Sequence, residues 1–72
     1  MTDRDALLAQ LATDLDALMT ANSLTQKSVY LAAGLNPRTV NRVLRAYDCR
    51  VSTLATVGQA LGYRVRIVFE RP

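Results

Sequence analysis

Two short helical segments, separated by one glycine, constrain the fold of this chain more than any other feature. Residues 23–45 read SLTQKSVYLAAGLNPRTVNRVLR, and the first helix is predicted over 26–33. Gly34 is expected to end that helix, because glycine adopts a positive φ without steric cost. Asn36-Pro37 is expected to start the second helix, over 37–46, since asparagine is a favoured N-cap and proline is favoured at the first helical position. The sequence therefore predicts two short helices joined by a tight turn.

The second of these helices is predicted to have two unlike faces. At about 100° per residue, apolar and aromatic side chains fall on one side. They are Val40, Val43, Leu44 and Tyr47. The opposite side carries hydrogen-bond donors, namely Arg38, Asn41, Arg42 and Arg45. One face is expected to pack into the domain while the other stays exposed.

The charges of the chain are unevenly distributed. Residues 1–22 carry four aspartates against one arginine, whereas residues 23–50 carry five basic side chains against one aspartate. A basic segment over 23–50 beside an acidic segment over 1–22 indicates that the basic segment binds a polyanionic partner. The alternative interpretation is a solvated charged surface without a specific partner.

Two further helices are predicted around the central pair. The first, over 3–21, has an apolar face at helical spacing. It consists of Leu8, Leu11, Leu15, Leu18 and Met19. Asn22 is expected to end it in the left-handed conformation. After a loop over 47–50, the last helix is predicted from Val51 or Ser52 to Leu61 and is stopped by Gly62. Its inward residues are predicted to be Val51, Leu54, Val57, Gly58 and Leu61. Gly58 suggests a close approach of two backbones.

The last segment, over 63–70, changes period and predicts one β-strand. Val65, Ile67 and Phe69 alternate with more polar residues, which is typical of a strand. The chain offers no second strand, so antiparallel pairing with the same strand of a second copy is expected, with these three side chains at the dimer interface. A frayed tail, or an edge kept for a different protein, are the alternatives.

The composition of the 72 residues excludes several classes of protein. With one cysteine and no histidine, the chain has neither an internal disulfide nor an ordinary His/Cys metal site. It also lacks a Ser-His or Cys-His nucleophile pair and a glycine-rich phosphate loop, so we expect no enzyme and no cofactor. Cys49 is interpreted as an unreactive loop cysteine, and the alternative is a reactive thiol. No signal peptide and no membrane-spanning run are recognised, which predicts a cytoplasmic protein.

The two central helices and the last predicted helix resemble the helix-turn-helix regulators of the Cro/CI type, also called the XRE family. The resemblance covers about residues 24–61 and rests on an ordered set of positions. They are Leu24-Thr25-Gln26, Val29, Ala33-Gly34-Leu35, Val40 with Val43, and residues 53–62, which match the family's fourth helix. Residues 60–68 are similar to the C-terminal segment of many small antitoxins of the HigA and HipB kind, in which a Leu-Gly pair is followed by a β-strand.

The resemblance and the residue chemistry together assign DNA contacts. The predicted base-contacting residues are Arg38, Thr39, Asn41 and Arg42, with Arg38 first because arginine can bind guanine through two hydrogen bonds. The predicted phosphate-contacting residues are Thr25, Gln26, Lys27, Asn36 and Arg45. Thr25 and Asn36 are also read as plain helix caps. The alternative for the arginines is exposure without a specific role.

Three positions depart from the family pattern. Tyr30 stands where alanine is usual, which puts the docking angle of the two helices in question. Leu31 points outward where a polar residue is usual, so the two residues are a candidate partner surface. Pro37 occupies a position that often carries a DNA-contacting side chain.

The chain is therefore predicted to be a single all-α domain over 1–72, a four-helix Cro/CI-like domain with its helix-turn-helix at 25–45 and a dimerisation strand at 63–70. The expected function is that of a homodimeric regulator from a bacterium or phage that binds an inverted repeat in double-stranded DNA and represses transcription. The alternative is an antitoxin that neutralises a toxin protein and regulates its own operon. A protein-only interaction module is a third reading.

Overall fold

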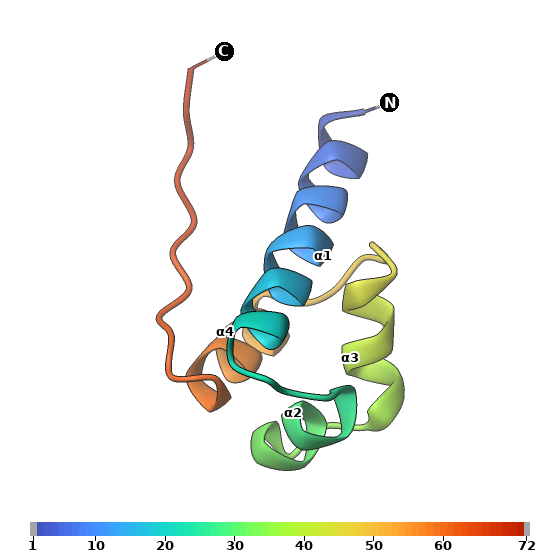
Figure 1. Ribbon diagram of the computed structural model, residues 1–72. Helices are drawn as coiled ribbons and strands as arrows, with labels where there is room; N and C mark the ends of the chain where they lie inside the picture. Colours follow the sequence, from blue (N-terminus) through green and yellow to red (C-terminus); the bar gives the residue numbers. More distant parts are fainter. Residues whose placement is uncertain (1, 72) are drawn as a thin grey trace.

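The structure is a computed structural model that describes residues 2–71, in which four α-helices form. They are α1 (Asp3–Ala21), α2 (Gln26–Ala33), α3 (Pro37–Leu44) and α4 (Val51–Ala60). Helix α1 packs against α3, and α2 contacts both α3 and α4 (Figure 1). The all-α class and the order of the four helices are as the sequence predicts. No helix within residues 2–71 combines the length and the hydropathy that a bilayer span needs.

The starts of the helices follow from their capping residues. The Thr2 hydroxyl accepts a hydrogen bond from the Asp5 N–H at 3.1 Å, and Asp5 in turn accepts from the Thr2 N–H, which forms a capping box. Thr25 and Ser28 form the same reciprocal arrangement at the start of α2. Gly34 ends α2 with φ 66°, in the left-handed region that a Cβ would strain.

Six apolar side chains make up the buried core. They come from all four helices and are Leu15, Met19, Val29, Val40, Val43 and Val57. Half-buried side chains surround them, including Tyr30 and Cys49. Tyr30 therefore sits at the edge of the core, whereas Leu31, the other half of the predicted partner surface, is 64% exposed.

Several predicted details of the helices are wrong. Asn22 has φ −103°, and the left-handed residue is Ser23, at φ 55°. Val51, predicted to face inward, is 61% exposed. It is the first residue of α4, and Cα–Cβ bonds tilt toward a helix's N-terminus, so its side chain extends past the end of the core. Helix α4 also ends at Ala60, one residue before the predicted Leu61.

The β-strand predicted over 63–70 does not form in the single chain. Residues 63–71 are extended, and no strand is assigned anywhere in residues 2–71. Within that range the segment's backbone is tied to the helices through Tyr63, whose N–H donates to the Gly58 carbonyl at 2.8 Å. The physical reason is that a strand needs a ladder partner, and the described part of the chain holds no second extended segment beside it. The segment instead runs alongside α1 (Figure 1).

Candidate nucleic-acid interface

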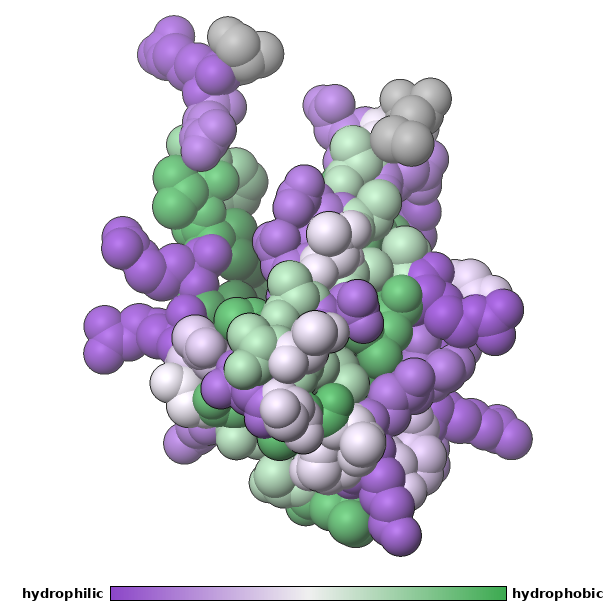
Figure 2. All heavy atoms as spheres, viewed as in Figure 1, coloured by the Kyte–Doolittle hydropathy of each residue, from purple (hydrophilic) through white to green (hydrophobic). Residues whose placement is uncertain are grey.

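Helix α3 presents one buried face and one basic face. Val40 is 0% exposed and Val43 is 2% exposed, whereas Arg38, Arg42 and Arg45 are exposed. Hydrophilic side chains gather over the α3 side of the molecule in Figure 2. The predicted separation of the two faces therefore holds for Val40, Val43 and the three arginines. Asn41, predicted on the exposed face, is half-buried.

The start of α3 fixes where its first arginine lies. The Asn36 side-chain oxygen accepts a hydrogen bond from the Arg38 N–H at 2.9 Å, and Pro37 occupies the first turn. This cap holds Arg38 in the first turn of the helix, with its side chain free. The Asn36 side-chain N–H groups are not used by this cap, and they are the donors that a phosphate oxygen would need.

The start of α2 lies beside α3. Gln26 and Lys27 are exposed in the first turn of α2, and the Asn41 side-chain amide of α3 donates to Oε1 of Gln26 at 3.4 Å. Two residues predicted to contact DNA are thus brought together from different helices. Thr25 is committed to capping, since its hydroxyl accepts from the Ser28 N–H at 3.2 Å.

The end of α3 differs from the prediction. The helix stops at Leu44, and Ala46 takes φ 62°, so the chain turns before Tyr47. The predicted inward position of Tyr47 is therefore wrong: the residue is 48% exposed. Its ring lies beneath two guanidinium groups, 5.4 Å from the Arg42 Cζ and 5.8 Å from the Arg45 Cζ. Cation–π contacts at exposed sites contribute about 0.5–1 kcal/mol each.

A hollow adjoins the basic face and adds Asp48, Arg50 and Thr53 to the residues that the sequence analysis considered. It has a volume of about 320 Å³ between α3, the following loop and the start of α4. Its lining residues are Thr39, Arg42, Asp48, Cys49, Arg50 and Thr53. Thr39 is half-buried and lines this hollow together with Arg42.

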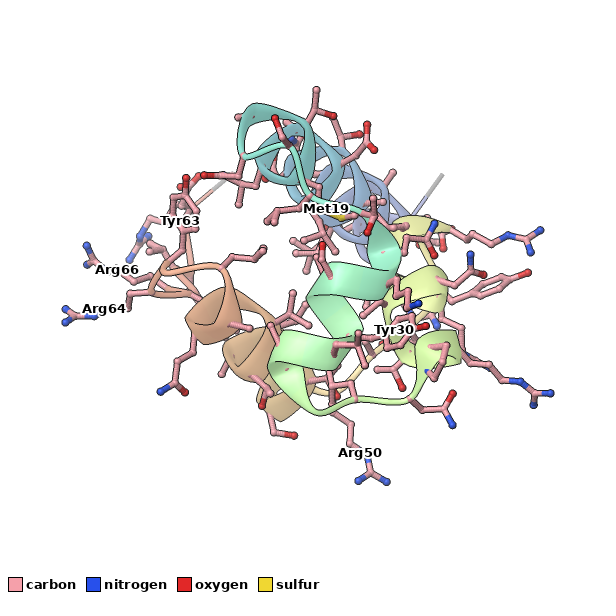
Figure 3. All side chains as sticks on the ribbon, turned by 60° about the horizontal axis from the view of Figure 1, so that its bottom comes forward. Met19, Tyr30, Arg50, Tyr63, Arg64 and Arg66 are labelled. Carbon is pink, nitrogen blue, oxygen red and sulfur yellow. The ribbon has the colours of Figure 1, made fainter. Side chains whose placement is uncertain are left out.

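Arg50 is the clearest residue that sequence reasoning missed. It is the N-cap of α4, makes no side-chain cap hydrogen bond, and extends away from the helices in Figure 3. Arg50 is the last loop residue before a predicted helix, and the N-terminus of a helix favours anions. An arginine at that place was therefore the signal in the sequence for an anion-binding position. Arg42 and Arg50 give the hollow two cations against the Asp48 carboxylate.

The loop between α3 and α4 is held to α1 by an ion pair. The Arg4 guanidinium lies 3.4 Å from the Asp48 carboxylate, and both side chains are largely exposed. Within the hollow, burial and then the Asp48 charge raise the pKa of the Cys49 thiol above its ordinary value. A raised pKa disfavours the thiolate, which agrees with an unreactive cysteine.

The predicted dimer residues lie on the C-terminal segment, away from the basic face. Val65, Ile67 and Phe69 are all exposed in the single chain, and Phe69 is 98% exposed. No group of three potential metal-ligating side chains occurs within residues 2–71.

Comparison with known proteins does not extend this description. No protein-family model, curated protein or solved structure matches the chain.

Proposed function

We propose that this protein is a sequence-specific regulator that binds double-stranded DNA, with α2 and α3 acting as a helix-turn-helix. The observation that carries the proposal is the division of α3 into a buried Val40/Val43 face and an exposed face with three arginines. A short helix anchored on one side and lined with guanidinium groups on the other suits the major groove, which admits an α-helix.

The positions of the side chains suggest their roles. Arg38, capped into the first turn of α3, is assigned to a base edge, since guanidinium can pair with guanine through two hydrogen bonds. Arg42 is assigned one turn further along the groove. Phosphate contacts are assigned to Gln26 and Lys27 at the start of α2, with Arg45 and Arg50 continuing the basic surface.

We further propose that the protein acts as a homodimer joined through the extended C-terminal segment. A backbone with few hydrogen bonds and exposed apolar side chains is a ready edge for a second strand. A two-fold dimer favours an inverted repeat with half-sites about 34 Å, or one turn, apart. Occupancy of such a site blocks a promoter, so repression in the cytoplasm of a bacterial or infected cell is the expected outcome.

The second candidate function is that of an antitoxin. It is favoured by the 64% exposure of Leu31, which lies on α2 and offers a small apolar contact. Co-purification of a small protein that is lost on Leu31→Ser substitution supports this function. DNA binding and toxin binding are compatible, because Leu31 is not among the proposed DNA contacts.

Fluorescence anisotropy with a labelled mixed-sequence duplex tests the proposal. The affinity is expected to fall with salt by about 0.9 log units per phosphate contact per log unit of salt. Arg42→Gln is expected to weaken binding and to flatten this dependence. Arg66→Gln is the charge-matched control, because it removes the same charge from the C-terminal segment, away from α3. Since Arg66 lies in the proposed dimer segment, the two variants are compared after sedimentation shows that their oligomeric states are equal. A salt-independent affinity, or equal effects of the two variants, contradicts the proposal.

A further inference from the structure

The C-terminal segment has two sides of different chemistry. Arg64 and Arg66 point away from the helices (Figure 3). Val65 packs against α4, since a Cβ placed on Gly58 would lie 2.5 Å from the Val65 Cγ2 atom. Because successive residues of an extended chain alternate, Ile67 is expected to share the helix-facing side with Val65.

Symmetry restricts how two such segments can pair. In an antiparallel ribbon, opposed residues share a face, while neighbours along each strand face opposite ways. If a two-fold axis perpendicular to the ribbon relates the two strands, it must therefore pass between one residue and the same residue of the partner strand. The identity of that residue defines the register. Within the segment, the axis can fall at Val65, Arg66, Ile67 or Val68.

Charge complementarity selects among these four registers. An axis at Arg66 sets that arginine against its own mate, and an axis at Val65 sets Arg64 against the partner's Arg66. Like charges directly opposite one another destabilise a pair of strands. An axis at Ile67 sets Arg64 against the partner's Glu70, and symmetry repeats this favourable pair.

The axis at Val68 is the closest competitor. It pairs Arg66 with the partner's Glu70, which is also favourable. However, it places the partner's Arg71 opposite Val65, on the helix-facing side, and pairs fewer residues of the segment. The axis at Ile67 instead places the partner's Phe69 opposite Val65, and it moves the partner's Arg71 to Tyr63, at the end of the paired residues.

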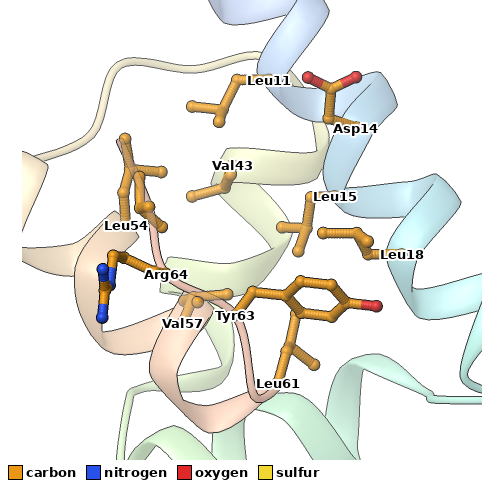
Figure 4. A pocket seen from close by; sticks show the side chains of 12 residues that line it. Leu11, Asp14, Leu15, Leu18, Val43, Leu54, Val57, Leu61, Tyr63 and Arg64 are labelled. Atoms are coloured by element: carbon orange, nitrogen blue, oxygen red, sulfur yellow. The ribbon is translucent and has the colours of Figure 1, made fainter. Parts of the chain in front are cut away.

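An apolar groove lies on that side. It has a volume of about 180 Å³ between α1, α4 and the start of the segment (Figure 4). Its apolar lining includes Leu11, Leu15, Leu18, Leu54, Leu61 and Val65. The partner's Phe69, placed beside Val65, is in position to cover this groove, and the ring is 98% exposed in the single chain.

We propose that two copies of this chain pair antiparallel through residues 63–71 with Ile67 on the two-fold axis. Each Arg64 then faces the partner's Glu70, and each groove is covered by the partner's Phe69. This register rests on the homodimer proposed above and specifies which residues of the two segments face each other. The occupant of each groove is a second copy of this chain.

Cysteine crosslinking tests the register. Ile67→Cys, Arg66→Cys and Val68→Cys are each made in a Cys49→Ser background and oxidised under native conditions. Opposed residues have Cα atoms about 4.5–5.5 Å apart, within disulfide range, whereas diagonal neighbours at about 7–8 Å are too distant. Ile67→Cys is expected to form the covalent dimer at least about tenfold faster than the other two. Faster crosslinking of Arg66→Cys or Val68→Cys overturns the register.

Sedimentation of the unsubstituted chain separates this outcome from failure of the dimer. A monomer at tens of micromolar overturns both the proposed dimer and the register. A dimer in which none of the three cysteines crosslinks overturns the register, and leaves either an axis at Val65 or an interface elsewhere, such as on α1.

A charge exchange gives a second readout that needs no oxidation. Glu70→Arg is expected to raise the dimer Kd about tenfold, since it replaces two attractive pairs by two repulsive ones. Arg64→Glu combined with Glu70→Arg is expected to restore the Kd to within about threefold of the original. An absence of rescue contradicts the Arg64–Glu70 pairing.

Discussion

The side-chain amide of Asn41 donates a hydrogen bond to Oε1 of Gln26 at 3.4 Å, which joins the exposed face of α3 to the first turn of α2. The bond is long, so its own contribution to folding is small. Its consequence is geometric: it orients two side chains that are both proposed to meet DNA, one near a base and one near a phosphate.

A double-mutant cycle on this pair tests whether the contact prepares the DNA-binding surface. Gln26→Ala and Asn41→Ala are each expected to weaken duplex binding. The double substitution is expected to cost about 0.5–1 kcal/mol less than the sum of the two, because residues in contact couple. The measurement is fluorescence anisotropy of each variant with the same duplex. Strict additivity would mean that the two side chains act separately.

The ring of Tyr47 beneath Arg42 and Arg45 gives a second prediction. Stacking uses the flat face of a guanidinium and leaves its in-plane N–H groups free for a base or phosphate. Tyr47→Leu is expected to weaken DNA binding about two- to fivefold, corresponding to an exposed cation–π contact of about 0.5–1 kcal/mol. Tyr47→Phe, which keeps the ring, is the control and is expected to bind as the original does. Equal affinities of the two variants contradict this role.

The exposed end of α3 also illustrates what the sequence could not predict. Helical spacing placed Val40 and Val43 in the core correctly, because a regular helix fixes those directions. The same spacing placed Tyr47 inward, which fails because Ala46 adopts φ 62° and breaks the period. Nothing in the local sequence marks Ala46 for that conformation, since alanine pays a steric cost there.

The candidate surface was predictable to a similar extent. Arg38, Arg42 and Arg45 are exposed as the spacing indicates, and Asn36 caps α3 as its residue type indicates. The hollow that brings Arg50 beside Arg42 was not predicted, because it depends on how the loop before α4 folds back. The extended C-terminal segment was recognised, but a strand is a property of two paired segments and cannot form in one.

Two glycines permit a matched test of the C-terminal segment. Gly58→Ala is expected to displace Val65, whose Cγ2 would lie 2.5 Å from the new Cβ, and so to raise the dimer Kd. The same change favours α4 itself by up to about 1 kcal/mol, since alanine has a higher helix propensity than glycine. Sedimentation and thermal unfolding report these two effects separately.

Gly34→Ala is the control for this experiment. Nothing lies within 4 Å of a Cβ at Gly34, so its cost comes from the backbone at φ 66°. Thermal unfolding is expected to show a loss of about 1 kcal/mol with an unchanged dimer Kd. An unchanged dimer in Gly58→Ala would mean that contact between α4 and Val65 does not position the segment.

The thiol of Cys49 provides a prediction about pH. Burial, followed by the charge of Asp48, raises its pKa above the ordinary value for a cysteine. The folded protein therefore binds this proton more tightly than the unfolded chain, whose cysteine has a pKa of about 8.5. The stabilisation is present below that unfolded value and is lost as pH rises through the folded pKa. Labelling by iodoacetamide is expected to accelerate at higher pH in the folded protein than in urea. Asp48→Asn is expected to move the folded profile part of the way back.

The central claim is that the arginines of α3 read duplex DNA, and selection of binding sites from a random duplex library tests it most directly. The account predicts enrichment of an inverted repeat with half-sites one helical turn apart. Arg38→Ala is expected to relax the preference at one position of each half-site while leaving the fold intact. Recovery of unenriched sequences by the original protein, or identical sites from both proteins, would contradict the account.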